Sequence, residues 1–250
     1  MAVGGGEAVV GTGHGLLAPM LRQRAGEQLA DRLVTALALG EFSVGERLPS
    51  ERDLAAQLRT SRATVAEAVR RLAASGHVEV RRGRSGGAFV LQTWTASSAD
   101  VVQRTLGTVW PDVEQHQDFR GLVEGLVART AAQRRTTDDV EALQAALSDF
   151  QAADSLEQAR VLDVALHRAV STAAHNSGLA ALSEQLQGQT TLGFALEPFT
   201  DEVFARAVPQ HAELVAAIVA GDADLAAETA TGHFALTTDV MRDLLRRAEG

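Results

Sequence analysis

Residues 48–90 read LPSERDLAAQLRTSRATVAEAVRRLAASGHVEVRRGRSGGAFV, and this stretch decides the fold of the N-terminal part of the chain. Ser50 is placed to cap one short amphipathic helix, and Thr60 or Ser61 to cap a second. Two short alternating runs then flank a turn of arginine and glycine, which is typical of a β-hairpin. A longer amphipathic stretch that begins near Arg24 precedes all of them. The order of three helices and a hairpin predicts a winged helix-turn-helix.

The charge of the chain is divided unevenly along its length. The formal net charge is −9, yet residues 1–92 hold 12 Arg against 9 acids (+3), whereas residues 93–250 hold 11 Arg against 23 acids (−12). Residues 47–84 alone hold 9 Arg and 4 acids (+5). Lys is absent, so every fixed positive charge is a planar guanidinium that can donate two parallel hydrogen bonds. The asymmetry predicts two domains with different partners, and double-stranded DNA suits the basic one.

The second of the two short helices is the predicted recognition helix, which would enter the major groove with its N-terminal residues at the base edges. The glycines of the hairpin turn would let its backbone approach DNA closely. The residues predicted to contact DNA are Arg52, Ser61, Arg62, Thr64, Arg70, Arg71, Arg82, Arg84 and Gly86. The alternative is a solvated basic face on a small helical domain. The agreement of caps, turn, periodicity and wing favours DNA binding.

The chain divides into an arm, two domains and a linker. Residues 1–23 are rich in glycine at their start and predict a flexible arm, residues 24–92 the winged helix-turn-helix, and residues 93–100 a linker. Residues 101–250 show helical periodicity in about six or seven segments, with Pro111 expected to end the first, and no convincing strand. The predicted fold class is therefore mainly α, with a C-terminal all-helical bundle.

Composition excludes several classes of protein. Aromatic residues make up only 4% and Tyr is absent, so the core must consist mainly of Leu, Val and Ala, which favours helices. Cys is absent, which excludes disulfides and thiolate metal sites. We find no run of about 18 apolar residues that would predict a membrane span, and no signal-peptide pattern. We therefore expect a cytoplasmic protein without a membrane partner.

Four side chains of the helical part could share one metal ion. Asp163 and His167 are four residues apart in one helical segment, so both lie on the same face. His211 and His233 lie in two later segments rich in apolar residues, so their faces should point into the bundle. Three imidazoles and one carboxylate suit a divalent ion, with Zn favoured and Ni, Mn or Fe as alternatives. Spacing alone equally fits unrelated histidines in a helical protein.

The N-terminal stretch resembles the DNA-binding domain of the GntR family of bacterial transcription regulators. The resemblance rests on the run LPSER, on the pattern SR-x-T-V-x-EA-x-R-x-L from Ser61 to Leu72, and on the basic wing from Val78 to Val90. One position departs from the family. The recognition helix usually carries Arg between its Val and its Glu, and here that residue is Ala66. The resemblance thus implies an operator that differs from the usual one.

Residues from about 98 to 247 resemble the FCD effector domain of the FadR-like branch of that family. The resemblance rests on Arg120 followed by Glu124, on the pair Asp163/His167, and on Asn176, His211 and His233. It implies that the Asp and the three His hold a divalent ion, which helps to bind a small carboxylate effector. Arg120 could bind the effector carboxylate or pair with Glu124. Asn176 could contact a metal-bound water or cap the next helix.

These features together predict a sequence-specific transcription regulator that binds a near-palindromic operator as a homodimer. An organic acid at the metal site would control binding, and repression is the favoured sign. Two other functions stay open, namely a metal-dependent hydrolase that uses the Asp/His cluster and a DNA-binding protein without an effector. A hydrolase would leave the winged helix unexplained, so we expect no enzyme activity.

Overall fold

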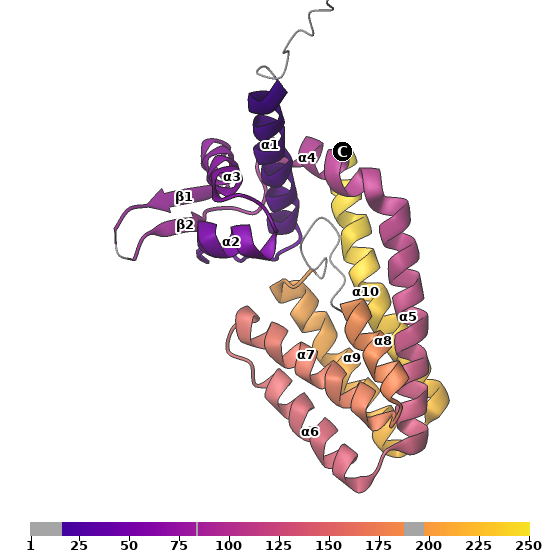
Figure 1. Ribbon diagram of the computed structural model, residues 1–250. Coiled ribbons are helices and arrows are strands. Elements are labelled where there is room, and N and C mark those ends of the chain that lie inside the picture. Colours follow the sequence, from indigo (N-terminus) through magenta and orange to yellow (C-terminus); the bar gives the residue numbers. More distant parts are fainter. Residues whose placement is uncertain (1–16, 84, 188–197) are drawn as a thin grey trace, which may run out of the picture.

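The computed structural model describes residues 17–83, 85–187 and 198–250. Figure 1 shows a small N-terminal part, from which a hairpin projects to one side, and a longer helical bundle. The first part consists of α1 (Leu17–Ala38), α2 (Glu51–Gln57), α3 (Arg62–Ala74), β1 (Val78–Arg81) and β2 (Gly87–Val90). The rest consists of α4 (Ser98–Val102), the π-helical η1 (Gln103–Gly107), α5 (Thr108–Arg134), α6 (Thr137–Gln151), α7 (Leu156–Ala173), α8 (Ser177–Gln187), α9 (Asp201–Ala220) and α10 (Ala223–Glu249). The predicted fold class, mainly α, is confirmed.

The N-terminal part is a winged helix-turn-helix, as predicted. Ser50 caps α2 and Ser61 caps α3, each through a side-chain oxygen that accepts a hydrogen bond from a backbone N–H of the first turn. Of the two caps predicted for α3, Ser61 is thus the one used. The strands pair antiparallel, with Val78 opposite Val90. One apolar core joins helices and hairpin, and its fully buried members include Leu33, Leu37, Leu54, Val65 and Leu72.

Two predicted boundaries differ from the structure. Helix α1 begins at Leu17, so residues 17–23, which we expected in the arm, are helical; residues 1–16 lie outside the described chain. Pro19 falls in the first turn, where its missing N–H would have no helical partner and therefore does not prevent the helix. The linker is also shorter than expected, because α4 already begins at Ser98.

Pro111 does not end a helix, contrary to the prediction. Helix α4 passes into the π-helical segment η1, which in turn passes into α5 at Thr108. The π-turn interrupts the regular α-helical hydrogen bonding just before α5. Pro111 therefore lies inside a continuous helical run, four residues after Gly107, the last residue of the π-helical segment. Gly107 carries the carbonyl to which the missing N–H of Pro111 would otherwise donate in an α-helix.

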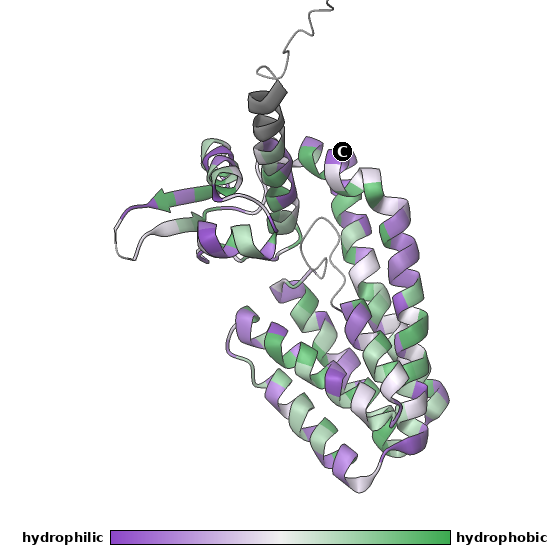
Figure 2. Ribbon diagram, in the orientation of Figure 1, coloured by the Kyte–Doolittle hydropathy of each residue, from purple (hydrophilic) through white to green (hydrophobic). Residues whose placement is uncertain are grey.

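Helices α5 and α10 form the longest contact of the bundle (Figure 1). A Cβ atom on Gly125 of α5 would lie 2.5 Å from the hydroxyl of Thr231 on α10, so the missing side chain lets the two helices approach closely. The core around this seam is built mostly of Leu, Val and Ala, as the composition predicts, and includes Val127, Ala128, Leu143, Leu166 and Ile218. In Figure 2 the apolar stripes of these helices alternate with hydrophilic ones, as expected of amphipathic helices around one core.

The later helices begin at polar caps. Thr136 caps α6 and forms a reciprocal capping box with Asp139. Thr200 and Asp222 cap α9 and α10. Over its described residues the bundle contains no strand, in agreement with the sequence analysis.

Helix α9 is long and apolar enough to cross a membrane, judged by length and composition alone. In the structure it packs against α5, α6, α7 and α10. Its buried residues include His211, Leu214 and Ile218. The core helix of a soluble protein meets the same criterion, and 39% of the apolar window of α9 is buried inside the structure.

Candidate metal centre and nucleic-acid interface

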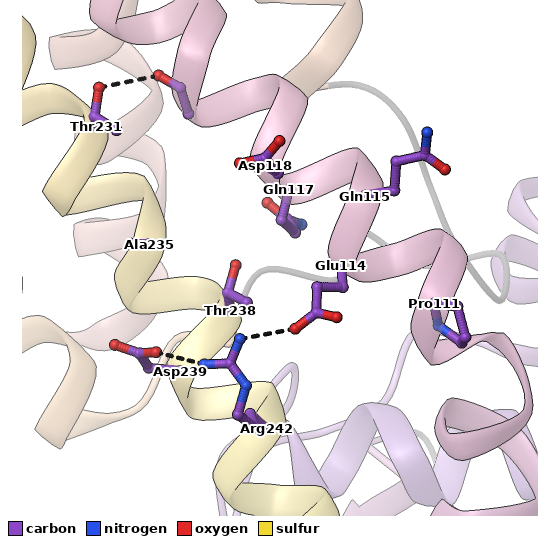
Figure 3. Close-up of a pocket in the computed structure, with 11 residues that line it drawn as sticks. Pro111, Glu114, Gln115, Gln117, Asp118, Thr231, Ala235, Thr238, Asp239 and Arg242 are labelled. Atoms are coloured by element: carbon purple, nitrogen blue, oxygen red, sulfur yellow. Dashed lines mark hydrogen bonds and ion pairs between the residues drawn. The ribbon is translucent and has the colours of Figure 1, made fainter.

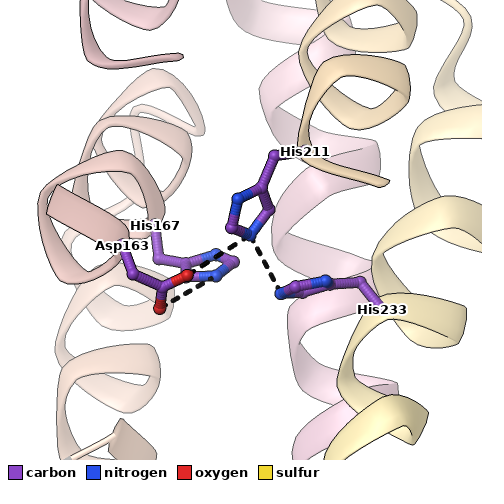
Figure 4. Close-up of side chains that lie close together, drawn as sticks. All are labelled: Asp163, His167, His211 and His233. Atoms are coloured by element: carbon purple, nitrogen blue, oxygen red, sulfur yellow. Dashed lines mark hydrogen bonds and ion pairs between the residues drawn. The ribbon is translucent and has the colours of Figure 1, made fainter. Parts of the chain in front are cut away.

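Three helices bring four metal-ligand side chains to one point in the bundle (Figure 4). Asp163 and His167 come from α7, His211 from α9 and His233 from α10. One ligand atom of each lies within 4.8 Å of all the others. The Nε2 atoms of His211 and His233 are 3.0 Å apart. The Asp163 carboxylate lies 3.5 Å from His211 Nε2 and 3.7 Å from His167 Nε2. The structure thus brings together all four residues that the sequence singled out.

The spacing of these atoms fits a single divalent ion. Ligand atoms that each lie about 2.0–2.2 Å from one ion are separated from one another by roughly 3.0–3.6 Å. The distances of 3.0 and 3.5 Å fall in this range, and the distance of 3.7 Å, to the other carboxylate oxygen of Asp163, lies just beyond it. The four ligand atoms all lie within 4.8 Å of one another, so small side-chain shifts would bring them onto one ion. Three imidazoles and a carboxylate are a donor set that Zn and its first-row neighbours accept, and such a set leaves room for a further ligand.

The three histidines are held in their neutral form by burial. Burial, and then the neighbouring His233, lowers the pKa of His211 to about 2. Burial, and then the charge of Arg120, lowers the pKa of His233 to about 4. Burial is also the largest cause of a pKa of His167 well below its usual value. A neutral imidazole carries the lone pair that a metal ion requires, so the cluster is ready to bind near neutral pH.

A second residue of α9 orients the imidazole of His233. Its Nδ1 lies 3.0 Å from the side-chain oxygen of Gln210. An Nδ1–H that donates to this oxygen leaves the lone pair on Nε2, which faces the cluster. The Nδ1 atom of His211 is buried and has no hydrogen-bond partner among the described residues. The polar contacts of the His211 ring are therefore all made through the nitrogen that faces the cluster.

A cavity of about 30 Å³ opens beside the cluster, and Arg120 lines it together with Asp163, His167, His233, Phe199 and Phe234. Arg120 is only 4% exposed, and its guanidinium carbon lies 4.6 Å from the centre of the Phe234 ring. Glu124, the alternative partner of Arg120, accepts a hydrogen bond from the hydroxyl of Ser183 at 2.8 Å. The cavity volume is that of about one water molecule, so an organic acid would have to displace side chains to enter.

Asn176 is a helix cap. Its side-chain oxygen accepts hydrogen bonds from the backbone N–H groups of Gly178 and Leu179, at 3.0 and 3.1 Å, at the start of α8. The residue is exposed and is not among the described residues that line the cavity beside the cluster. Of the two roles that the sequence left open, the structure supports the cap. The effector contact of Asn176 stays a prediction.

A larger groove, of about 510 Å³, lies elsewhere on the α5–α10 seam (Figure 3). Arg242 pairs there with Glu114 at 2.8 Å and with Asp239 at 2.9 Å. The buried side-chain oxygen of Gln117 has no hydrogen-bond partner within the described part of the chain. The groove contains none of the four cluster residues. A search for the metal site by cavity volume alone would therefore have chosen this groove, which does not contain the four cluster residues.

In the N-terminal part, a groove of about 500 Å³ lies between α2, α3 and the hairpin. Arg52 and Arg62 line it, as does Arg47, which the sequence analysis missed. Arg47 stands in an irregular stretch where no periodic pattern marks it, and a β-bridge to Phe89 ties it to the hairpin. Its Nε would lie 2.5 Å from a Cβ atom at Gly87, so glycine is needed there. Three arginines thus share one basic groove.

The other residues predicted on α3 have partners within the protein. The hydroxyls of Ser61 and Thr64 lie 2.8 Å apart in the cap of the helix. Arg70 and Arg71 both pair with Glu67, at 2.5 and 3.0 Å. Arg71 also faces α1 rather than the hairpin side of the domain. The positive charge of α3 that is not paired with Glu67 therefore lies at the N-terminal end of the helix, at Arg62.

The predicted wing residues lie between the two strands. Arg82 is exposed, and Gly86 follows the tight turn of the hairpin. Gly83 has φ +111°, a conformation that residues with a side chain rarely adopt. Arg84 lies outside the described residues. Among the described residues, Arg82 is thus an exposed positive charge of the wing.

Comparison with known proteins matches both parts of the chain. Residues 25–90 match the bacterial regulatory proteins of the gntR family, and residues 116–236 match the FCD domain. The galactonate operon transcriptional repressor of Escherichia coli is 30% identical over 86% of this chain and 97% of its own length. The putative L-lactate dehydrogenase operon regulatory protein of Escherichia coli is 29% identical over 89% of this chain and 88% of its own. The solved Streptococcus agalactiae GntR is 24% identical, with a TM-score of 0.44, and covers 87% of this chain and 99% of that one.

The two matched segments are the winged helix-turn-helix and the helical bundle, in the same order as in the structure. A regulator of Mycobacterium tuberculosis of the HTH type is a further relative, 33% identical over 66% of this chain and 67% of its own length. The chain belongs to the GntR family of bacterial transcription regulators and carries an FCD domain.

Proposed function

We propose that this regulator binds a near-palindromic operator as a homodimer in the cytoplasm, and that a small organic acid bound beside a divalent ion changes its affinity for that operator. The observation that carries the proposal is the convergence of the Asp163 carboxylate and three histidine Nε2 atoms on one point. The sensing part and the DNA-binding part are then two separate domains of one chain.

The residues around the cluster suit a carboxylate. A divalent ion held by the four side chains would supply a Lewis-acidic centre for one carboxylate oxygen. Arg120 lines the same cavity and presents a fork of N–H donors, which matches a carboxylate in two parallel hydrogen bonds. The ring of Phe234 supports the guanidinium from one side. The binding site would thus combine two positive centres that face one small space.

The effector can alter DNA binding only if it prefers one arrangement of the two domains, and typical couplings of this kind change affinity about 5–150-fold. We propose that the effector weakens operator binding and so relieves repression. The relative that regulates the galactonate operon is called a repressor, which supports this sign.

The DNA contact is proposed to lie at the groove of Arg47, Arg52 and Arg62, with the wing beside it. In this orientation the N-terminal end of α3 faces the bases, as recognition helices do. The net charge of −12 on residues 93–250 keeps the bundle away from the phosphates.

The homodimer is proposed to form through one face of α5. Phe119, Leu122 and Leu126 recur there at helical spacing and are 48%, 62% and 50% exposed. A second copy of the same helix can cover this stripe, because a two-fold axis pairs a surface with itself. Two protomers joined in this way would present two recognition helices to two half-sites.

Fluorescence anisotropy with labelled DNA from upstream of the regulated gene tests the core of the proposal. We expect tight binding to this DNA and far weaker binding to a scrambled sequence of equal length. Binding that depends on salt but not on sequence would contradict it. A thermal-shift screen of sugar acids, hydroxy acids and dicarboxylates, with and without a chelator, then identifies the effector class. The ligand should be recovered unchanged after incubation with zinc-loaded protein, whereas turnover would indicate a hydrolase.

A further inference from the structure

The C-terminal end of α1 is held by a residue of the effector domain. Gly40 ends this helix in a left-handed conformation, with φ +79°. The carbonyl oxygens of Leu37 and Ala36, in the last turn, accept hydrogen bonds from the backbone N–H groups of Gly40 and Glu41. Arg160 of α7 holds the chain just beyond the helix, because its guanidinium donates to the carbonyl oxygens of Gly40 and Glu41. The two halves of this contact lie about 120 residues apart in the sequence.

Arg160 also belongs to the surroundings of the metal cluster. It precedes Asp163 by three residues on α7, so the two side chains lie within one turn of the same helix. The guanidinium carbon of Arg160 lies 5.7 Å from the centre of the Phe199 ring, and the group also donates to the Phe199 carbonyl at 3.4 Å. Phe199 and Asp163 line the same cavity. A change in that cavity therefore reaches Arg160 from two sides.

The two other helices of the cluster meet α1 at the same end. Thr200, the cap of α9, packs so closely that its methyl group would lie 2.5 Å from a Cβ atom on Gly40. Met241 and Leu244 of α10 share an apolar cluster with Leu39. Each helix that carries a cluster residue thus contacts the last turn of α1 or the chain just after it.

Helix α1 in turn lies along the recognition helix. A Cβ atom on Gly26 of α1 would lie 2.5 Å from the side chain of Glu67 on α3. Leu33 and Leu37 of α1 are fully buried in the same core as Val65 and Leu72 of α3. A shift of α1 cannot leave α3 in place, because packed cores transmit displacements rather than absorb them.

We infer that the C-terminal end of α1 is the relay between the metal centre and the DNA-binding domain, and that Arg160 is the positioning residue that couples them. This inference rests on the proposed metal site. When the four ligands are drawn to one ion, α7, α9 and α10 are fixed relative to one another. Arg160, Thr200 and Leu244 then hold the end of α1 in one position, and α1 holds the recognition helix.

Hydrogen–deuterium exchange of the full chain, with zinc ions or with a chelator, tests the relay. In the wild-type protein we expect zinc to slow exchange in α7 and α10 around the ligands, and also in residues 36–46. In Arg160→Gln the slowing in α7 and α10 should persist, whereas the slowing in residues 36–46 should be lost. Arg168→Gln is the matched control, because Arg168 lies on the same helix, is 70% exposed and only approaches Glu184 at 4.0 Å. It should behave as the wild type.

The outcomes separate the relay from the metal site. Slowing in residues 36–46 that persists in Arg160→Gln overturns the relay while leaving the metal site intact. Absence of slowing anywhere overturns the metal site and the relay with it. Arg160→Lys serves as a second variant if Arg160→Gln folds poorly, because lysine keeps the positive charge and can donate to one of the two carbonyl oxygens. We expect Arg160→Lys to retain only part of the zinc-dependent slowing in residues 36–46. Slowing as large as in the wild type would show that the coupling does not need both hydrogen bonds of Arg160.

Discussion

His211 and His233 face each other across α9 and α10, with their Nε2 atoms 3.0 Å apart. Two nitrogen lone pairs cannot face each other at this distance without a proton or a cation between them. The contact of His233 Nδ1 with Gln210 directs the lone pair of His233 toward this point. Without an ion, a neutral His211 that carries its proton on Nε2 can donate it to His233. A metal ion that binds both nitrogens would require His211 to carry this proton on Nδ1 instead, which is buried and has no hydrogen-bond partner among the described residues.

Removal of the metal should lower the melting temperature by about 5–10 °C. An ion present at about a hundred times its Kd stabilises the folded state by about 2.7 kcal/mol, and each kcal/mol changes Tm by about 2–4 °C in a chain of this size. Differential scanning fluorimetry with zinc and with a chelator measures the difference. His233→Ala should lose the response to zinc, whereas His116→Ala, outside the cluster, should keep it. An equal zinc response in the two variants would speak against the metal centre.

Arg62→Ala should weaken operator binding by about tenfold or more, because a guanidinium paired with a base contributes about 1–3 kcal/mol of discrimination. Arg47→Ala should make the slope of log K against the logarithm of salt concentration shallower by about one, as expected for the loss of one phosphate contact. Arg71→Ala is the contrasting variant, since Arg71 already pairs with Glu67 at 3.0 Å. Anisotropy titrations at several salt concentrations distinguish the three. A loss for Arg71→Ala as large as that for Arg62→Ala would place the DNA on a different face.

Ala66→Arg should change the preferred base at one position of each half-site. Ala66 lies in the second turn of α3, where its methyl group cannot hydrogen-bond to a base edge. Selection of binding sites from random DNA should show weak preference at that position for the wild type and a stronger one, favouring G, for the variant. Identical selected sites would mean that α3 enters the groove at another angle.

Stability should fall as the pH drops below about 6.5 because of His77. This side chain is fully buried between Ser75 and Ser98, at 2.8 and 3.0 Å, and burial lowers its pKa below the usual 6.5. The unfolded state then binds more protons than the folded state between the two pKa values, so stability present above pH 6.5 is lost below it. Melting temperatures from pH 5 to pH 8, in chelator, measure the slope.

The control for this prediction is His77→Gln, which should unfold at a lower temperature but lose part of the slope. The metal-site histidines contribute to the same slope, so His77→Gln is compared with the wild type in the same chelated state. An unchanged slope would assign the whole effect to other groups.

Leu122→Glu should convert the proposed dimer to a monomer. Leu122 is 62% exposed at the centre of the α5 stripe, and a carboxylate there would be buried opposite its own copy on the two-fold axis. Size-exclusion chromatography with light scattering measures the mass. Val161→Glu, at a position on α7 that is 67% exposed, is the matched control and should remain a dimer. A dimeric Leu122→Glu would place the interface on another surface.

Local signals in the sequence predicted the elements well. The caps Ser50, Ser61 and Asp222 are visible because a short polar side chain stands just before an apolar period. Pro111 misled the prediction, because the sequence does not reveal that a π-turn restarts the helix just before it. Thr136 and Thr137 are adjacent and equally suited to capping, and only the reciprocal bond with Asp139 distinguishes them.

The metal cluster required more than spacing. The Asp163/His167 pair follows from helical periodicity, but nothing local shows that His211 and His233, on two other helices, meet it. The resemblance to FCD domains supplied that link before the structure did. Arg47 and Arg160 were missed because both act through contacts with segments far away in the sequence, and neither stands in a pattern. The cap made by Asn176 became visible only through the hydrogen bonds that its side chain accepts.

The glycine at position 125 has a consequence for the metal centre. A side chain there would press on Thr231 of α10, at 2.5 Å from its hydroxyl and 3.2 Å from the carbonyl of Ala227. His233 follows two residues after Thr231 on the same helix, so α10 cannot move away from α5 without moving a metal ligand. If the cluster holds an ion as we propose, a side chain at position 125 would displace His233 and so alter which metal fits, although the four ligand residues stay the same.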